Sequence, residues 1–250
     1  IADKLESTIR IVCWVWCSGR DIYNQTVAIR KTWGRKCDKL IIFTDVQFVG
    51  IDTIDLVRAD VTYSKSRYIM AYRYVYKHYK DYGDWFFGTF DETYVCMENL
   101  RLFLSQKNPR EPFYYGHKLY LKDKNLEFVD ARVGCVLSKD ALRKLGTTGT
   151  KLKECNEMEP AGEKQLGACL NNLGVMRGNS TDVRGRTLFL SFPPALQMQG
   201  LQSDWFMEQD LEGKQQGVDS ISRYAITFSG MTAFFMYGID CYLFHMRPFG

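Results

Sequence analysis

Short apolar runs alternate with amphipathic segments in the first part of the chain. Residues 9–16 are β-branched and aromatic and end at Ser18 and Gly19, a pattern typical of a buried central strand. An amphipathic segment at 26–35 predicts a helix, and the apolar run at 39–43 predicts a second strand. This alternation of strand, helix and strand indicates a parallel sheet with crossover helices.

A longer helix is predicted at 66–82, where aromatic and aliphatic residues recur at three- and four-residue spacing. The next strand, at 85–87, is followed closely by Asp91 and Glu92. Ligands bind at the carboxyl ends of strands in open α/β sheets. The acidic pair therefore stands where a binding site is expected.

The rest of the chain supplies further elements around the same sheet. Predicted strands lie at 113–116, 127–129, 135–137 and 226–228, the first two on either side of a polar turn at 122–125. Predicted helical segments lie at 98–106, 139–145 and 162–173, and residues 234–243 form a final apolar segment that is either helical or extended. A polar loop is expected at 146–160, and the region at 197–216 is the least regular. Because the chain has no internal repeat and no clear linker, we expect residues 1–250 to form a single α/β domain with a mostly parallel central sheet flanked by helices.

Composition and charge exclude some functional classes. The chain has 250 residues, of which 46% are hydrophobic and 25% are charged, which is typical of a globular protein with a proper core. The formal net charge of +4 comes from 33 basic and 29 acidic residues without a basic block, so we expect no nucleic-acid partner. No run approaches the roughly 18 apolar residues that would cross a bilayer, so the chain as given is expected to be soluble.

Eight cysteines and two glycosylation sequons bear on the compartment. No two of the cysteines have the CxxC spacing of a zinc site, which argues against a metal cluster. The sequons begin at Asn24 and Asn179 and fit a secretory-pathway protein in which some cysteines pair. The sequence does not settle the connectivity. The candidate disulfides are Cys13 with Cys37 and Cys155 with Cys169.

Taken alone, the acidic pair Asp91 and Glu92 has two interpretations. A sugar-nucleotide transferase must neutralise the diphosphate that leaves, and it commonly uses a divalent cation held by carboxylates at the end of a strand. Carboxylates near the start of a helix are also favourable without any ligand, because they lie at the positive end of the helix dipole. His78, His117 and His245 are too far apart in sequence to suggest a ligand set.

Residues 85–95 resemble the strand and acidic motif of the animal core 1 β1,3-galactosyltransferases, a family of fringe-like glycosyltransferases. The motif of that family is Asp-Trp-Phe, a few residues, and then Asp-Asp-Asp-Thr-Tyr-Val. Further matches run in order along almost the whole chain, at 11–15, 30–33, 37–39, 74–79, 111–116, 136–142, 167–170 and 245–250. The resemblance implies a GT-A-like fold. If the chain is active, it also implies Mn²⁺ as cofactor, UDP-galactose as donor and GalNAc-Ser/Thr glycoproteins as acceptors.

The chain departs from that family at positions that carry chemistry. Phe90 and Glu92 replace the first and third acids of the motif, so only Asp91 is unchanged. Ser229 replaces a histidine that helps to hold the metal in the family. A phenyl ring cannot ligate a metal, and a hydroxyl is a poorer ligand than an imidazole. Arg132 stands in a Gly-Gly segment of the family, where an added side chain is expected to fill part of the acceptor pocket.

The resemblance also assigns the remaining candidate residues. Glu163 matches the family's presumed general base, with its carboxylate displaced by about one methylene, and a displacement of that order is costly. Trp205 and Phe206 lie in a region that helps to bind the acceptor in the family. As an exposed apolar pair they would equally suit a partner interface.

Two functional hypotheses follow from these residues. In the first, the chain is a pseudoenzyme that resembles the Cosmc-type chaperones of the family at 114–117, 162–166 and 228–232, although it keeps the acidic residues that those chaperones lack. Its partner would be a related galactosyltransferase or a second copy of itself in mucin-type O-glycosylation. In the second, the acidic pair still holds Mn²⁺ and Glu163 acts as the base of an active β1,3-galactosyltransferase. The lost metal ligands favour the first hypothesis. Both imply the lumen of the endoplasmic reticulum or Golgi, with a type II membrane anchor in the full-length protein.

Overall fold

The computed structural model describes residues 2–18, 21–45, 50–157, 161–202, 204–212 and 217–246. Within these residues the centre is a seven-stranded sheet with the order β10-β6-β9-β4-β1-β2-β3. Its strands are β1 (Ile11–Trp16), β2 (Lys39–Thr44), β3 (Ile54–Asp55), β4 (Trp85–Phe90), β6 (Phe113–Gly116), β9 (Cys135–Ser138) and β10 (Met176–Arg177). Neighbouring strands are parallel except at β9, which runs antiparallel to both β4 and β6.

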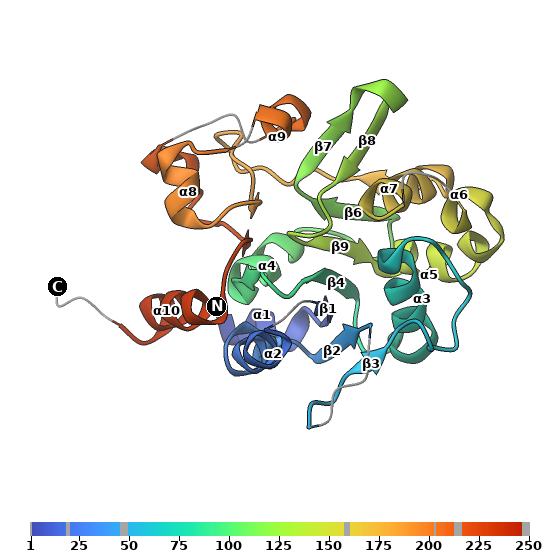
Figure 1. Ribbon diagram of the computed structural model, residues 1–250, viewed down its shortest axis with the longest axis horizontal. Coiled ribbons are helices and arrows are strands. Elements are labelled where there is room, and N and C mark those ends of the chain that lie inside the picture. Colours follow the sequence, from blue (N-terminus) through green and yellow to red (C-terminus); the bar gives the residue numbers. More distant parts are fainter. Residues whose placement is uncertain are drawn as a thin grey trace.

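Helices cover both faces of this sheet (Figure 1). The even-numbered residues of β1 face a core shared with α3 (Arg67–Tyr79), α5 (Lys139–Gly146) and α7 (Glu163–Asn172). The odd-numbered residues face a core shared with α2 (Ile22–Lys31) and α4 (Met97–Leu104). Because both faces are covered, β1 is buried along its whole length, which explains its continuous apolar sequence.

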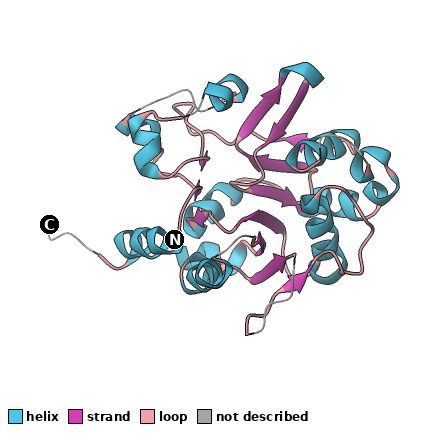
Figure 2. Ribbon diagram, in the orientation of Figure 1, coloured by secondary structure: helices cyan, strands magenta, loops and turns pink. Residues whose placement is uncertain are grey.

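Two smaller sheets lie beside the main one. A three-stranded sheet has the order β11-β12-β5, and a two-stranded hairpin of β7 and β8 projects from the body of the molecule (Figure 2). These strands are β5 (Tyr94–Val95), β7 (Lys118–Leu121), β8 (Leu126–Val129), β11 (Phe189–Leu190) and β12 (Thr227–Phe228). The remaining helices are α1 (Ala2–Thr8), α6 (Lys153–Asn156), α8 (Pro194–Gln199), α9 (Asp204–Gln209) and α10 (Ala233–Phe244), with 3-10 turns at Trp33–Lys36, Lys122–Lys124, Thr148–Lys151 and Val218–Ser220. Among the described residues, no helix combines the length and apolarity needed to cross a membrane.

The predicted α/β class, with a mostly parallel central sheet flanked by helices, is confirmed. The predicted strand at 113–116 is confirmed as β6 of the main sheet, and the predicted polar turn at 122–125 connects β7 to β8. Asn125 closes this connection, because its left-handed backbone (φ 46°) permits a tight turn.

Two local predictions are wrong, and both concern segments expected to lack regular structure. The expected loop at 146–160 contains a 3-10 turn and α6 in its described part, and the described part of the expected irregular region at 197–216 includes the end of α8 and all of α9. These helices have only four to six residues. A helix of that length is too short for hydrophobic periodicity to reveal it.

Ser138 joins three parts of the fold, and its replacement gives a first testable prediction. Its buried Oγ accepts hydrogen bonds from the backbone of Ala141 (3.1 Å) and Phe113 (3.2 Å), and donates one to the carbonyl of Glu111 (2.7 Å). Ser138→Ala removes the helix cap of α5 and leaves the backbone N–H of Ala141 without its acceptor, while Phe113 and Glu111 keep their mutual backbone hydrogen bond, so we expect a loss of about 1–2 kcal/mol in unfolding free energy. Urea denaturation measures it. The exposed Ser105→Ala is the matched control, and an equal loss in both variants would contradict the assignment.

Candidate functional site

A cavity of about 370 Å³ opens at the carboxyl end of β4. On one side of the sequence, its walls come from Ser18, which follows β1, and from the end of β4 with the acidic pair. The loop after β8, the residues after β11 and β12, and helix α9 supply the rest. The cavity therefore brings together positions that are far apart in the sequence. Those predicted from the sequence are Phe90, Asp91, Glu92, Arg132, Phe206 and Ser229.

Asp91 is the most constrained acid of the cavity. Only 4% of its surface is exposed, and its Oδ2 accepts a hydrogen bond from the backbone N–H of Ser18 (3.2 Å). Burial, together with the neighbouring Glu92 charge, raises the pKa of Asp91 to about 6 despite this hydrogen bond. Glu92 is exposed at the cavity wall. Within the described residues, the pair thus provides one buried carboxylate that forms no ion pair and one solvated carboxylate.

Phe90 is packed against the helix layer. Its ring is parallel to that of Tyr68 on α3, with centroids 5.4 Å apart and an interplanar angle of 1°. Offset stacking of this kind adds about 0.5–1.5 kcal/mol to the burial of the two rings. The position that carries the first acid of the family motif is therefore built into the apolar core on that side.

Arg132 is fixed through both its guanidinium and its backbone carbonyl. Its guanidinium donates to both carboxylate oxygens of Asp130 (2.9 and 3.0 Å), and these bonds raise the pKa of Arg132. Its carbonyl accepts hydrogen bonds from Thr89 Oγ1 (2.8 Å), Thr93 Oγ1 (3.2 Å) and the backbone N–H of Phe90 (3.2 Å). The arginine is therefore fixed beside the end of β4, with its charge matched by a buried acid.

Ser229 and Phe206 complete the wall opposite the acids. The backbone N–H of Ser229 donates to the carbonyl of Leu190 (3.1 Å), which sets the serine at the cavity from the small sheet. The interpretation of Phe206 as part of an exposed apolar pair is wrong, because it is only 3% exposed. Its ring packs edge-on against Phe192 at a centroid distance of 4.9 Å. The side chain of Trp205 lies outside the described residues.

Glu163 begins α7 and is not on the cavity wall. Its charge nevertheless reaches the residues behind that wall. Burial first, and then the Glu163 carboxylate, raise the pKa of Tyr68 well above its ordinary value, and the same carboxylate contributes to the raised pKa of Arg132. Glu163 therefore lies close enough to act on the charges of Tyr68 and Arg132, but it is not among the described residues that line the cavity.

The described cavity residues offer few of the ligands that a divalent cation of the Mn²⁺ type takes. Such ions take about six oxygen or nitrogen ligands, usually with two or more carboxylates or imidazoles from the protein. Within the described part of the chain, no three histidine, cysteine, aspartate or glutamate side chains converge to hold a metal. Asp91 and Glu92 remain as the charged donors that could approach one, while Asp130 is engaged by Arg132.

Sequence reasoning missed two buried acids near the cavity. Asp130 lines the cavity and is only 1% exposed. Its position two residues before Arg132 is the sequence feature that could have identified it. Asp210 follows α9 and accepts a hydrogen bond from Nε2 of the buried His117 (3.0 Å). His117 Nδ1 faces the carbonyl of Phe189 (2.9 Å) and the hydroxyl of Thr187 (3.1 Å), so both ring nitrogens face groups that can accept a hydrogen bond. The hydrogen bond and charge of Asp210 outweigh burial and raise the pKa of His117.

The other predicted residues lie away from the cavity. Asn24 is exposed on α2, and Asn179 is exposed in the segment after β10. Both candidate disulfides are present. Cys13–Cys37 ties β1 to the residues before β2, and Cys155–Cys169 ties α6 to α7.

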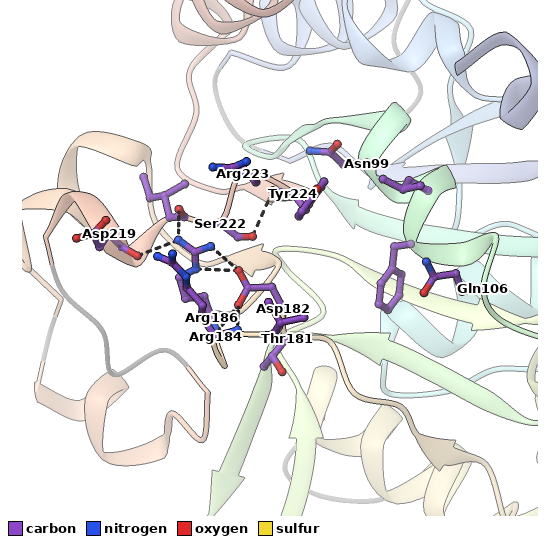
Figure 3. A pocket seen from close by; sticks show the side chains of 14 residues that line it. Asn99, Gln106, Thr181, Asp182, Arg184, Arg186, Asp219, Ser222, Arg223 and Tyr224 are labelled. Carbon is purple, nitrogen blue, oxygen red and sulfur yellow. Dashed lines mark hydrogen bonds and ion pairs between the residues drawn. The ribbon is translucent and has the colours of Figure 1, made fainter. Parts of the chain in front are cut away.

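A larger hollow of about 980 Å³ lies between α4 and the segments 181–186 and 219–224 (Figure 3). Arg186 spans it, donating to the carboxylate of Asp182 (2.8 Å) and to the carbonyl of Asp219 (3.2 Å). Although burial opposes ionisation, hydrogen bonds from Arg186 and Ser222 lower the pKa of Asp182 to about 2. These polar groups bond one another, and they fix the shape of the hollow.

Known proteins resemble the chain at the level of family, sequence and structure. Residues 23–184 match the protein family described as Fringe-like. The whole chain aligns with 70% of the glycoprotein-N-acetylgalactosamine 3-beta-galactosyltransferase 1 of Xenopus laevis, at 27% identity over 259 residues. Among solved structures, a Drosophila β1,4-galactosyltransferase 7 mutant in complex with manganese, UDP-Gal and xylobiose aligns with a TM-score of 0.33 and 10% identity. That alignment covers 68% of this chain and 64% of the other, less than two thirds of its length.

Proposed function

The chain belongs to the Fringe-like family, and from this premise we propose that it is a catalytically degenerate homologue of core 1 β1,3-galactosyltransferases. It acts by binding, as a Cosmc-like chaperone or partner of an active galactosyltransferase in mucin-type O-glycosylation. We place it in the lumen of the secretory pathway, as one GT-A-like domain over residues 1–250 behind a type II membrane anchor. The paired cysteines are consistent with that oxidising compartment.

The observation that carries this proposal is the stack of Phe90 on Tyr68. The first acid of the family motif has been replaced by a ring that packs into the helix layer. A change that only weakened a metal site would not require the neighbouring helix to supply a matching aromatic surface. Phe90 is thus part of the packing of α3 against the end of β4, which supports a structural role for a former ligand position.

The charge of the cavity supports the same conclusion. Among the described residues that line it, Asp91, Glu92 and Asp130 stand against the single guanidinium of Arg132. A nucleoside diphosphate brings further negative charge, and like charges within a partly buried cavity repel strongly. Without a bound divalent cation, the cavity therefore disfavours the donor of a sugar-nucleotide transferase.

The alternative is an active enzyme that uses Mn²⁺ and UDP-galactose to modify GalNAc-Ser/Thr acceptors. It is favoured by the convergence of the acidic pair with Arg132 and Phe206 on one cavity at the carboxyl end of β4. In that case Asp91 and Glu92 would hold the metal, and the metal would neutralise the diphosphate. Glu163 does not line this cavity, so it would have to move toward it to act as base.

Titration calorimetry with UDP, with and without MnCl₂, tests the proposal. We expect no detectable binding of millimolar UDP to the wild-type protein in either condition, and no manganese-dependent release of UDP from UDP-galactose. The double variant Phe90→Asp with Ser229→His restores two donors of the family. It should gain manganese-dependent UDP affinity of at least roughly tenfold, or about 1.4 kcal/mol.

Phe90→Leu is the matched control, because it removes the aromatic stack without adding a carboxylate. It should not gain UDP binding. Manganese-dependent UDP binding and turnover by the wild-type protein would establish the active alternative instead. The chaperone role is measured separately, as the refolding yield of a denatured core 1 galactosyltransferase with and without this protein.

A further inference from the structure

Helix α10 leaves an aromatic face uncovered. Among its described residues only Met236 and Asp240 are buried, although the helix is largely apolar. Phe234 is 79% exposed and Tyr237 is 40% exposed. An apolar surface of this kind normally has an occupant, because exposed aromatic clusters promote association.

The start of α10 packs beside α2, and Asn24 on α2 lies at the border of the exposed face. A hollow of about 350 Å³ is lined on the α2 side by Asp21, Asn24 and Val27, and on the α10 side by residues that include Phe234 and Tyr237. Asn24 is the first residue of an Asn-Gln-Thr sequon. A modifiable amide thus shares one hollow with two exposed aromatic rings.

The three sequon residues differ in solvent exposure. Gln25 and Thr26 are buried, and Gln25 Nε2 donates to the carbonyl of Met231 (3.1 Å). Asn24 is exposed, and its Nδ2 donates to Oδ1 of Asp21 (2.6 Å), which also lines the hollow. The amide nitrogen of Asn24 is therefore held at the hollow by a neighbour on the same wall.

We propose that Asn24 carries an N-linked glycan whose first sugar rings lie on the aromatic face of α10 at Phe234 and Tyr237. The Nδ2 of Asn24 attacks C1 of the first N-acetylglucosamine of a lipid-linked oligosaccharide diphosphate. The new N–C1 bond replaces the C1–O bond, the lipid diphosphate leaves with the electron pair, and the amide loses one proton. The second amide hydrogen remains, so the bond to Asp21 can persist.

The chemistry of the two surfaces is complementary. The face of an aromatic ring carries a negative potential, and the C–H groups on one face of a pyranose are weakly positive. The hydroxyl and acetamido groups of the sugar remain in water. Two or three sugar rings would cover the rings at the start of α10 and convert an apolar surface into a hydrated one.

Transfer of the glycan must precede folding of α2. Thr26, whose hydroxyl the sequon requires, is fully buried, and its Oγ1 contacts the sulfur of Cys17 at 3.6 Å. The sequon is therefore accessible only before α2 docks on the sheet. This proposal rests on the secretory location in the proposed function, but not on whether the chain is active, because no residue lines both this hollow and the β4 cavity.

The test uses the chain secreted from a eukaryotic host. Digestion with peptide-N-glycosidase in H₂¹⁸O, followed by peptide mass spectrometry, should convert Asn24 to labelled aspartate. Enzymatic removal of the glycan from the folded protein should increase the fluorescence of an apolar dye and lower the thermal midpoint by about 2–4 °C. In a Phe234→Ser and Tyr237→Ser double variant, deglycosylation should no longer change either quantity.

Two controls separate this contact from other effects of a glycan. Asn179→Gln removes the second sequon and should leave the dye response to deglycosylation unchanged. Phe235→Ser changes an exposed ring of α10 that does not line the hollow, and should retain the response. An unmodified Asn24 in the secreted protein overturns the proposal. A glycan on Asn24 whose removal alters neither dye binding nor the thermal midpoint overturns it as well, and so does a self-associated glycoprotein that buries this face.

Discussion

Asp210→Ala is expected to lower the free energy of unfolding by about 3–5 kcal/mol, the range for breaking one side of a buried ion pair. His117 and Asp210 are each about 2% exposed, and the pair joins the start of β7 to the end of α9. Without the carboxylate, Nε2 of His117 and the backbone N–H of Glu212, which also donates to Asp210 (2.8 Å), lose their acceptor. Because Phe206 belongs to the same α9 segment, the variant should also loosen the wall of the β4 cavity.

The same pair gives the protein a pH dependence with a defined sign. Burial lowers the pKa of His117 in the folded state, but the hydrogen bond and charge of Asp210 outweigh burial and raise it. The charges of Glu212 and Asp130 raise this pKa further. A raised histidine pKa stabilises the fold fully below the unfolded value near 6.5, and this contribution is lost as the pH rises through the folded pKa. The wild-type protein should therefore lose stability above about pH 6.5, and Asp210→Ala should lose that dependence.

Urea denaturation at several pH values measures both effects. Asp210→Asn is the matched variant, since it removes the charge but keeps the size of the side chain and an oxygen that can accept from Glu212. It should be less destabilising than Asp210→Ala and also insensitive to pH in this window. If Asp210→Ala kept the wild-type pH dependence, the histidine would not be the titrating group.

The fold was predictable from the sequence where the hydrophobic pattern extends over many residues. Strand β1 and helix α3 have strong apolar patterns, and the predicted ranges agree with the structure to within three residues. Helix α6 has four residues and is fixed by tertiary contacts: the disulfide to α7 and a hydrogen bond from Ser64 Oγ to the carbonyl of Cys155 (2.7 Å). No local pattern encodes such contacts, so the segment resembles a loop in sequence.

The candidate site was predictable only in part, for a related reason. Asp91 follows β4 directly, so its place at the edge of the sheet follows from the strand itself. Ser229 and Phe206 reach the cavity from distant segments, and only the family resemblance linked them to it. The pair of His117 and Asp210 spans 93 residues of sequence, and each residue alone has the pattern of an ordinary polar position.

Asp91→Asn is expected to stabilise the protein at neutral pH by about 2–3 kcal/mol. Burial is the main cause that raises the pKa of Asp91 to about 6, so the ionised carboxylate is unfavourable in the folded state. For an acid with a raised folded pKa, the fold is most stable below the unfolded value near 3.9 and loses stability as the pH rises toward the folded value. Asparagine avoids that loss and keeps an oxygen that accepts from Ser18.

The stability difference between Asp91→Asn and the wild-type protein should therefore be small at pH 4, grow to pH 6 and remain constant above it. Urea denaturation across this range measures the difference, and the exposed Glu92→Gln should change stability by less than about 0.5 kcal/mol at every pH. Repeating the series with MnCl₂ separates the two functions. If the chain is a degenerate homologue, manganese does not change the higher unfolding free energy of Asp91→Asn relative to the wild-type protein. In an active enzyme, manganese stabilises the carboxylate and reverses the order of the two proteins, because a bound cation compensates the buried charge.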